Sequence, residues 1–140
     1  MRVSPADQPL DLLDLSILAE LRILEVTQCH LGFEHFPDFS WTILQATSDA
    51  TAIEVIKIKY TSIWPFSMHT EFFSGPIAEE YWRKGDAIMT GRLYPALKEV
   101  HLILIMSNCN TTMLPNPKKC FPSLSCGQTA LLTTRIERSV

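Results

Sequence analysis

Three segments of this chain repeat one arrangement of large aliphatic residues, and this repetition limits the available folds more than any other feature. The segments are AELRILEVTQCHL (19–31), AIEVIKIKYTSI (52–63) and PALKEVHLILIM (95–106). In each, an aliphatic residue is followed by two more, three and five positions later, which gives the sets Leu21, Leu24, Val26; Ile53, Ile56, Ile58; and Leu97, Val100, Leu102. Because side chains two positions apart lie on the same face of a β-strand, the pattern predicts three equivalent strands.

The stretches between these strands favour helices. In PDFSWTILQAT (37–47), Ser40 has a side chain suited to an N-cap, and we expect Ile43 and Leu44 to face the strands. Neighbouring parallel strands need a crossover connection between them. The order strand, helix, strand, helix, strand therefore indicates an α/β fold with about three parallel strands.

The second helix is predicted over SGPIAEEYWRKGDAIMTGR (74–92), where Pro76 suits the first helical position because its missing N–H is not needed there. Gly85 lies inside this stretch, and a glycine in a helix interior costs about 1 kcal/mol relative to alanine. We therefore expect the helix to bend or break at Gly85. Trp41 and Trp82 fall on the two helices, and we expect each to anchor its helix to the sheet.

The first segment also matches a known repeat. LRILEVTQCHL (21–31) fits the leucine-rich-repeat consensus L-x-x-L-x-L-x-x-N/C-x-L, with Cys29 at the Asn/Cys position. The other two segments keep the aliphatic positions, but Thr61 and Ile105 stand where Asn or Cys is usual. The chain thus resembles a leucine-rich-repeat protein. The resemblance implies a partial solenoid with its helices on one side and its strands offering an extended concave surface.

A narrower likeness covers roughly residues 10–105. LDLSILAELRILEV (13–26), WTILQATSDATAIEVIKI (41–58) and YWRKGDAIMTGRLYPALKEVHL (81–102) resemble the degenerate C-terminal leucine-rich region of fungal F-box proteins. This resemblance implies substrate recognition within an F-box-type ubiquitin ligase component. The F-box itself, which docks the Skp-type adaptor, has no counterpart in 1–20. That adaptor is therefore expected as a partner only if an F-box lies upstream.

Two regions follow from the composition. We expect residues 1–106 to form the leucine-rich-repeat-like region and residues 107–140 to form a loop-rich C-terminal tail. The tail begins with SNCNTTMLPNPKKCFPS (107–123), which holds three prolines, and proline interrupts both helices and sheets. Its end, TALLTTRIERSV (129–140), favours a short helix and an edge strand.

A cysteine and a histidine stand side by side at Cys29 and His30, which raises the question of a reactive or metal-binding site. A structural zinc site needs closely spaced ligand pairs, and the four cysteines, at 29, 109, 120 and 126, lack that spacing. The leucine-rich-repeat likeness implies instead that Cys29 points inward and is packed. We predict no metal and no cofactor. Two alternatives stay open: a small hydrolase or thiol enzyme, for which no G-x-S-x-G elbow occurs, and a truncated or degenerate fragment without independent function.

Charge and hydropathy argue against two classes of partner. Nucleic-acid binding needs a clustered basic face, and a chain with a net charge of −3 gives no indication of one. The longest apolar run, VHLILIM (100–106), is far shorter than the roughly 20 residues of a membrane-spanning helix. The first residues lack a secretory signal, since only Arg2 is basic there. We therefore expect no nucleic-acid or membrane partner, and a cytoplasmic or nuclear location with reduced cysteines.

The candidate site consists of the residues that alternate with the buried aliphatics and so face the open, concave side. They are Ile23, Glu25, Thr27, Val55, Lys57, Lys59, Glu99, His101 and Ile103. Across in-register strands, Glu25, Lys57 and His101 form one row, which is either a cross-strand ion pair or a charged strip that binds a protein partner. Trp64 is either a cap over the solenoid end or a binding hot spot. We predict a non-catalytic protein-binding module with the partner-binding residues Glu25, Lys57, Lys59, His101 and Trp64.

Overall fold

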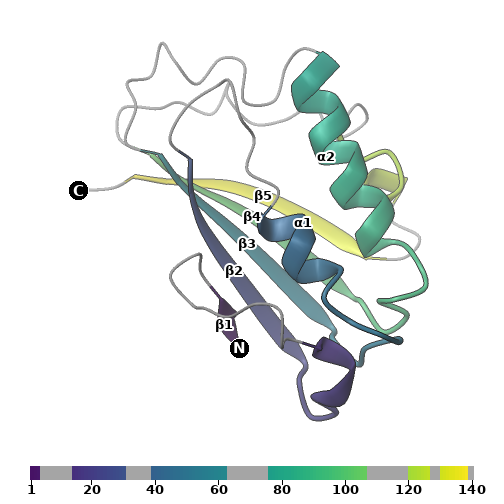
Figure 1. Cartoon of the computed structure of the whole chain (residues 1–140). Coiled ribbons are helices and arrows are strands. Elements are labelled where there is room, and N and C mark those ends of the chain that lie inside the picture. The colour runs from purple at the N-terminus through teal and green to yellow at the C-terminus, as the bar shows by residue number, and fades with distance from the viewer. Residues whose placement is uncertain (4–13, 31–38, 63–75, 107–119, 127–129, 139–140) are drawn as a thin grey trace.

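The computed structural model is an α/β fold built on one parallel sheet (Figure 1). It describes residues 1–3, 14–30, 39–62, 76–106, 120–126 and 130–138. Five strands follow one another in the order β1-β2-β3-β4-β5, and every neighbouring pair is parallel. The strands are β1 (Arg2–Val3), β2 (Ile23–His30), β3 (Val55–Ser62), β4 (Glu99–Met106) and β5 (Leu131–Arg138). The helices are α1 (Phe39–Leu44) and α2 (Pro76–Met89), with short 3-10 helices η2 (Leu15–Ile17) and η5 (Leu124–Cys126).

The register of the strands places the repeated aliphatic residues side by side. Leu24 pairs with Ile56, which pairs with Val100, and the next inward row aligns in the same way as Val26, Ile58 and Leu102. All six side chains are buried in the core. The equivalence predicted from the spacing of the three segments is therefore confirmed.

The same alignment extends beyond the strands, at their N-terminal ends. The backbone N–H of Glu54 donates to the carbonyl of Arg22 at 2.8 Å, and that of Lys98 donates to the carbonyl of Glu54 at 2.7 Å. At the start of the strands, the N–H of Leu131 donates to the carbonyl of Lys98 at 2.9 Å, as the N–H of its register partner Glu99 does to the carbonyl of Glu54 at 3.1 Å. Equivalent residues of successive units thus contact each other before the strands begin.

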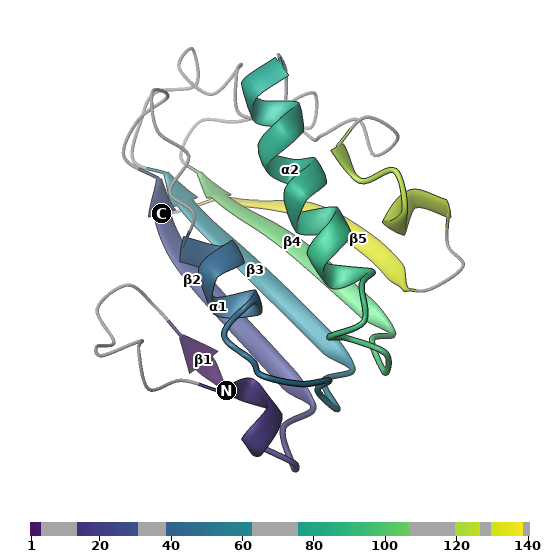
Figure 2. The same cartoon turned by 45° about the vertical axis from the view of Figure 1, so that its right-hand side comes forward.

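Both helices lie on the same face of the sheet, as Figures 1 and 2 show from two directions. A crossover between parallel strands is almost always right-handed. When each new strand is added on the same side of the previous one, right-handed crossovers all fall on one face. The order of the strands therefore explains why α1 and α2 share a face, and why the opposite face carries no described helix.

The number of strands differs from the prediction of about three. β1 is a two-residue strand beside β2, and β5 pairs with β4 over all eight of its residues. β5 breaks the repeated pattern because Leu132 is in register with Val100, but Thr134 stands in register with Leu102. Its backbone still completes the ladder of hydrogen bonds, which a threonine supports as well as an aliphatic residue does.

Aromatic side chains join the helices to the sheet. Trp82 of α2 packs edge-on against Tyr60 of β3, with ring centroids 5.3 Å apart, and lies 5.7 Å from Phe121. Trp41 of α1 lies 5.0 Å from Tyr81 of α2. Both tryptophans are fully buried. The contact of Trp82 with Tyr60 confirms that Trp82 anchors α2 to the sheet, whereas the ring contacts described for Trp41 join α1 to α2.

Two details of the helices were predicted wrongly. Ser40 lies inside α1 and is not its N-cap; its buried hydroxyl oxygen accepts a hydrogen bond from Tyr60 Oη at 3.3 Å. α2 runs from Pro76 to Met89 without a break at Gly85. A Cβ atom at Gly85 would overlap the indole ring of Trp41. The glycine therefore permits α1 and α2 to approach closely, and this packing offsets its cost to the helix.

Two aspartates join segments that are distant in the sequence. Asp14 accepts hydrogen bonds from the Ser16 hydroxyl at 2.7 Å and from the Ser48 hydroxyl and N–H at 2.7 and 3.0 Å. These bonds hold the pKa of the Asp14 carboxyl well below its usual range, and the bond from the Ser16 side chain has the largest effect. The buried Asp86 of α2 accepts from the backbone N–H groups of Ser123 and Leu124 at 3.1 and 2.9 Å. It thereby fastens the connection between β4 and β5 to α2.

Replacing Gly85 by alanine tests the close approach of the helices. Alanine is the better helix former by about 1 kcal/mol, so an unhindered site would gain stability. We expect instead a loss of about 1–3 kcal/mol in the free energy of unfolding, because the added methyl group meets the Trp41 ring. Urea denaturation measures the change.

The control is the double variant Gly85→Ala with Trp41→Phe, compared with Trp41→Phe alone. The smaller ring makes room for the methyl group, so Gly85→Ala is expected to cost much less in that background. An equal cost in both backgrounds would show that Trp41 is not the reason for the glycine.

Candidate functional site

The candidate site is the sheet face turned away from α1 and α2, which we call the open face. Side chains alternate between the two faces along each strand, so the predicted residues and their register partners in the neighbouring strands lie on the open face. Its described side chains are Arg2, Ile23, Glu25, Thr27, Val55, Lys57, Lys59, Thr61, Glu99, His101, Ile103, Ile105, Leu131, Thr133, Arg135 and Glu137. The face is therefore wider than predicted, because β1 and β5 add a margin on each side.

The predicted row of polar residues is present. Glu25 pairs in register with Lys57, and Lys57 pairs with His101. The row continues to Thr133 of β5, and Arg2 of β1 stands at its other end, in register with Glu25. The strands thus carry a continuous line of polar side chains across the middle of the open face.

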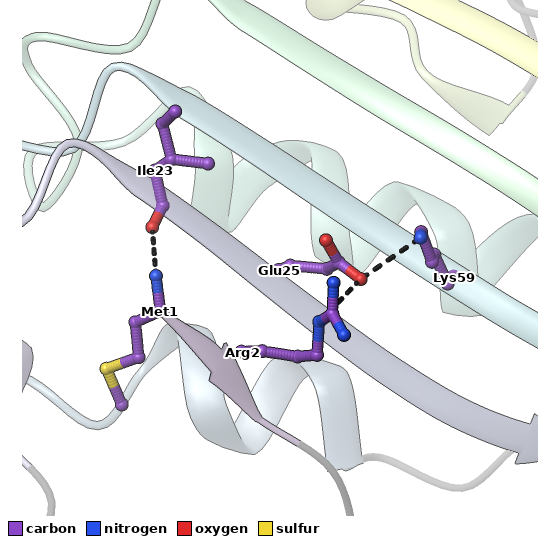
Figure 3. Close-up of polar contacts among 5 residues, drawn as sticks. All are labelled: Met1, Arg2, Ile23, Glu25 and Lys59. Atoms are coloured by element: carbon purple, nitrogen blue, oxygen red, sulfur yellow. Dashed lines mark hydrogen bonds and ion pairs between the residues drawn. The ribbon is translucent and has the colours of Figure 1, made fainter.

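Glu25 binds two basic side chains, and neither is its register partner Lys57. Its Oε1 atom lies 3.1 Å from Lys59 Nζ and 3.2 Å from Arg2 Nε (Figure 3). The contact with Lys59 is diagonal, one pleat further along β3, which the long lysine side chain can span. The Glu25 side chain is only 14% exposed. The ion pairs therefore neutralise a carboxylate that the sheet largely removes from water.

β1 is fixed beside β2 by backbone contacts at the same place. The amino group of Met1 donates to the carbonyl of Ile23 at 2.9 Å (Figure 3). The N–H of Glu25 donates to the carbonyl of Met1 at 2.7 Å. These bonds hold Arg2 in register with Glu25. The short strand thus positions the arginine that pairs with Glu25.

Two further pairs on the open face join residues of the same strand. His101 Nε2 lies 3.9 Å from Glu99 Oε2, and Arg135 Nη2 lies 2.8 Å from Glu137 Oε1. Among the lysines and arginines that the structure describes on this face, Lys57 alone has no ion pair. Its half-buried side chain stands at the centre of the face.

Apolar side chains occupy the row at the N-terminal ends of the strands. Ile23 is 49% exposed and Leu131 is 62% exposed, with Val55 and Glu99 between them in register. Ile103 lies four residues further along β4 and is only 1% exposed. Its register partners are Lys59 of β3 and Arg135 of β5. The open face therefore combines exposed apolar side chains with a line of charges.

Two predicted residues cannot be placed on this face. Trp64 lies outside the described residues. Cys29 belongs to β2 and pairs in register with Thr61, but its side chain, like that of His30, is outside the described part. The packing of Cys29 and the binding role of Trp64 stay predictions.

Several residues of the face were missed from the sequence. Arg2 was missed because a two-residue strand has no detectable pattern. Thr133, Arg135 and Glu137 alternate with Leu132 and Ile136, a period of two that is typical of a half-buried strand. The edge strand expected in 129–140 was not connected with the face, although this alternation was the signal that could have placed its polar residues there.

Within the described residues, no group of three or more His, Cys, Asp or Glu side chains is placed to hold a metal ion. None of the helices described is both long and apolar enough to cross a bilayer. Of the two cysteines whose side chains the structure describes, Cys120 is buried and Cys126 is exposed.

In comparisons with known proteins, no family model, no curated protein and no solved structure matches this chain. The function is therefore inferred from the open face itself. Its pattern of paired and unpaired charges is the most specific feature available.

Double-mutant cycles test the pairing of Glu25. Combining Glu25→Gln with Lys59→Met is expected to give a coupling energy of about 0.5–1 kcal/mol in the free energy of unfolding at low salt. Combining Glu25→Gln with Lys57→Met serves as the control and is expected to give a smaller coupling, since Glu25 and Lys57 are neighbours in register but form no ion pair among the described contacts. Urea denaturation of the single and double variants measures both. A larger coupling for Lys57 than for Lys59 would contradict the diagonal pairing.

Proposed function

We propose that this chain is a non-catalytic protein-binding module, a leucine-rich-repeat-like partial solenoid that binds its partner on the open face. The observation that carries the proposal is the one-sided covering of the parallel sheet. Sheets made only of parallel strands are usually covered on both faces. Here the described helices cover one face, and the other exposes large apolar side chains such as Ile23 and Leu131.

The one-way winding of the chain supports the solenoid part of the proposal. In a solenoid each unit contacts its neighbours in sequence, and equivalent residues stack. β2, β3 and β4 follow that rule in their order and in the register of Leu24, Ile56 and Val100. The leucine-rich-repeat consensus in 21–31 starts two residues before β2 and places two of its aliphatic positions in the core.

The chemistry of the open face supports a protein partner. Protein interfaces combine an apolar centre with polar and charged side chains around it. The open face has exposed Ile23 and Leu131 beside the row that contains Glu25, Lys57 and His101. These side chains project from paired strands, so their positions are fixed before a partner arrives, which lowers the entropic cost of binding.

The resemblance to fungal F-box proteins suggests which system the module serves. We propose substrate recognition within an F-box-type ubiquitin ligase component, in the cytoplasm or nucleus. The three stretches that resemble that family, 13–26, 41–58 and 81–102, include the beginnings of β2, β3 and β4. A Skp-type adaptor is a partner of this proposal only if an F-box precedes these residues.

The double variant Ile23→Asn with Leu131→Asn tests binding on the open face. Both side chains are exposed, so the fold is expected to survive, which a thermal melt followed by circular dichroism checks. Proteins retained from a cell extract by the wild-type chain are quantified by mass spectrometry. We expect the specific partners to be retained about tenfold less by the double variant, because apolar contacts at the interface are lost.

Ile17→Asn is the matched control. Ile17 is 73% exposed, but it lies on η2 and not on the open face. Retention by this variant is expected to equal that of the wild type. Equal retention by all three proteins, or a loss with Ile17→Asn alone, would contradict binding on the open face.

A further inference from the structure

We propose that the partner binds as an extended segment that places a carboxylate against Lys57 and an apolar side chain against Val55 and Ile23. This inference rests on the proposed function and names the chemistry of the partner. It follows from the arrangement of charges on the open face and from the spacing of Lys57 and Val55 along β3.

Each carboxylate described on the open face already lies beside a basic side chain. Glu25 binds Lys59 and Arg2 at 3.1 and 3.2 Å. The other two carboxylates described there are those of Glu99, 3.9 Å from His101, and Glu137, 2.8 Å from Arg135. None of these carboxylates is within ion-pair distance of Lys57, whose ammonium group lacks a counter-ion among the described residues.

Covering the ammonium group of Lys57 without supplying a counter-ion is unfavourable. Lys57 stands in β3, the central strand, between Glu25 and His101. A partner that covers the middle of the open face removes water from Lys57, and a buried charge without a counter-ion is strongly unfavourable. The partner therefore has to supply an acceptor there, and a carboxylate restores both the charge balance and the hydrogen bonds.

The net charge of the face points the same way. Its described lysines and arginines exceed its carboxylates by one, although the whole chain has a net charge of −3. The residues counted are Arg2, Lys57, Lys59 and Arg135 against Glu25, Glu99 and Glu137. The open face is thus more positive than the rest of the molecule, which favours an acidic partner.

The spacing of the neighbouring residues defines the rest of the segment. Val55 precedes Lys57 by two positions on β3, a separation of about 7 Å along the strand. Val55 pairs in register with Ile23, and the two form an apolar patch with Ile23 half exposed. An extended segment presents side chains of the same face two residues apart at this distance. The expected sequence pattern is therefore an aliphatic or aromatic residue and an aspartate or glutamate separated by one residue.

Selection from a displayed library of random linear peptides tests this inference on the full chain. We expect wild-type protein to enrich peptides with the apolar and acidic pattern. Lys57→Glu is expected to enrich lysine or arginine in place of the acidic residue, and Lys57→Met to lose the charge preference. A synthetic peptide from the wild-type selection is expected to bind Lys57→Met about tenfold more weakly, with an affinity for wild type that falls as salt is raised.

Arg92→Glu is the matched control, because Arg92 is exposed in the turn after α2 and its replacement makes the same change in charge away from the open face. It is expected to select the wild-type pattern. The inference would be overturned if the selected peptides show no acidic preference and bind wild type and Lys57→Glu equally, but do not bind Ile23→Asn with Leu131→Asn. That result would leave the proposed function standing. If the wild-type protein enriches peptides no more strongly than the Ile23→Asn, Leu131→Asn protein does, both the inference and the proposed function are overturned.

Discussion

The fold depends on the stacking of equivalent aliphatic side chains across parallel strands. Leu24, Ile56 and Val100 stand in register and are removed from water on the helix side of the sheet. A slip of one residue would turn every one of these side chains to the opposite face, so the burial of the rows fixes the register. Because successive strands are added in one direction, the right-handed crossovers fall on a single face.

This one-sided arrangement explains the character of the open face. The residues between the buried aliphatics are brought into rows, and the rows determine which charges can meet. Glu25 is shared by Lys59 and Arg2, and Lys57 is left without a counter-ion among the described residues although it stands in register with Glu25. The charge pattern proposed for recognition is thus a consequence of strand register and of the reach of individual side chains.

The sequence predicted the three central strands and their register because buried positions two residues apart leave a repeated aliphatic pattern. An edge strand was predicted in 129–140, where β5 lies, but it was not predicted as a fourth unit of the repeat, since Thr134 stands at one of the aliphatic positions. The continuity of α2 was missed because the role of Gly85 depends on Trp41, on another helix and far away in the sequence. The pairing of Glu25 with Lys59 was missed because register fixes backbone neighbours and leaves open which diagonal contact a long side chain makes.

Methyl contacts measured by nuclear magnetic resonance test the parallel, in-register sheet most directly. In protein labelled at the Ile, Leu and Val methyl groups, we expect nuclear Overhauser contacts from Leu24 to Ile56, from Ile56 to Val100 and from Val100 to Leu132. A second row is expected from Val26 through Ile58 to Leu102, with contacts to α1 and α2 from these rows and none from Ile23 or Leu131. Contacts that run in the opposite sense along neighbouring strands, or aliphatic rows that do not meet, would contradict the sheet and the open face together.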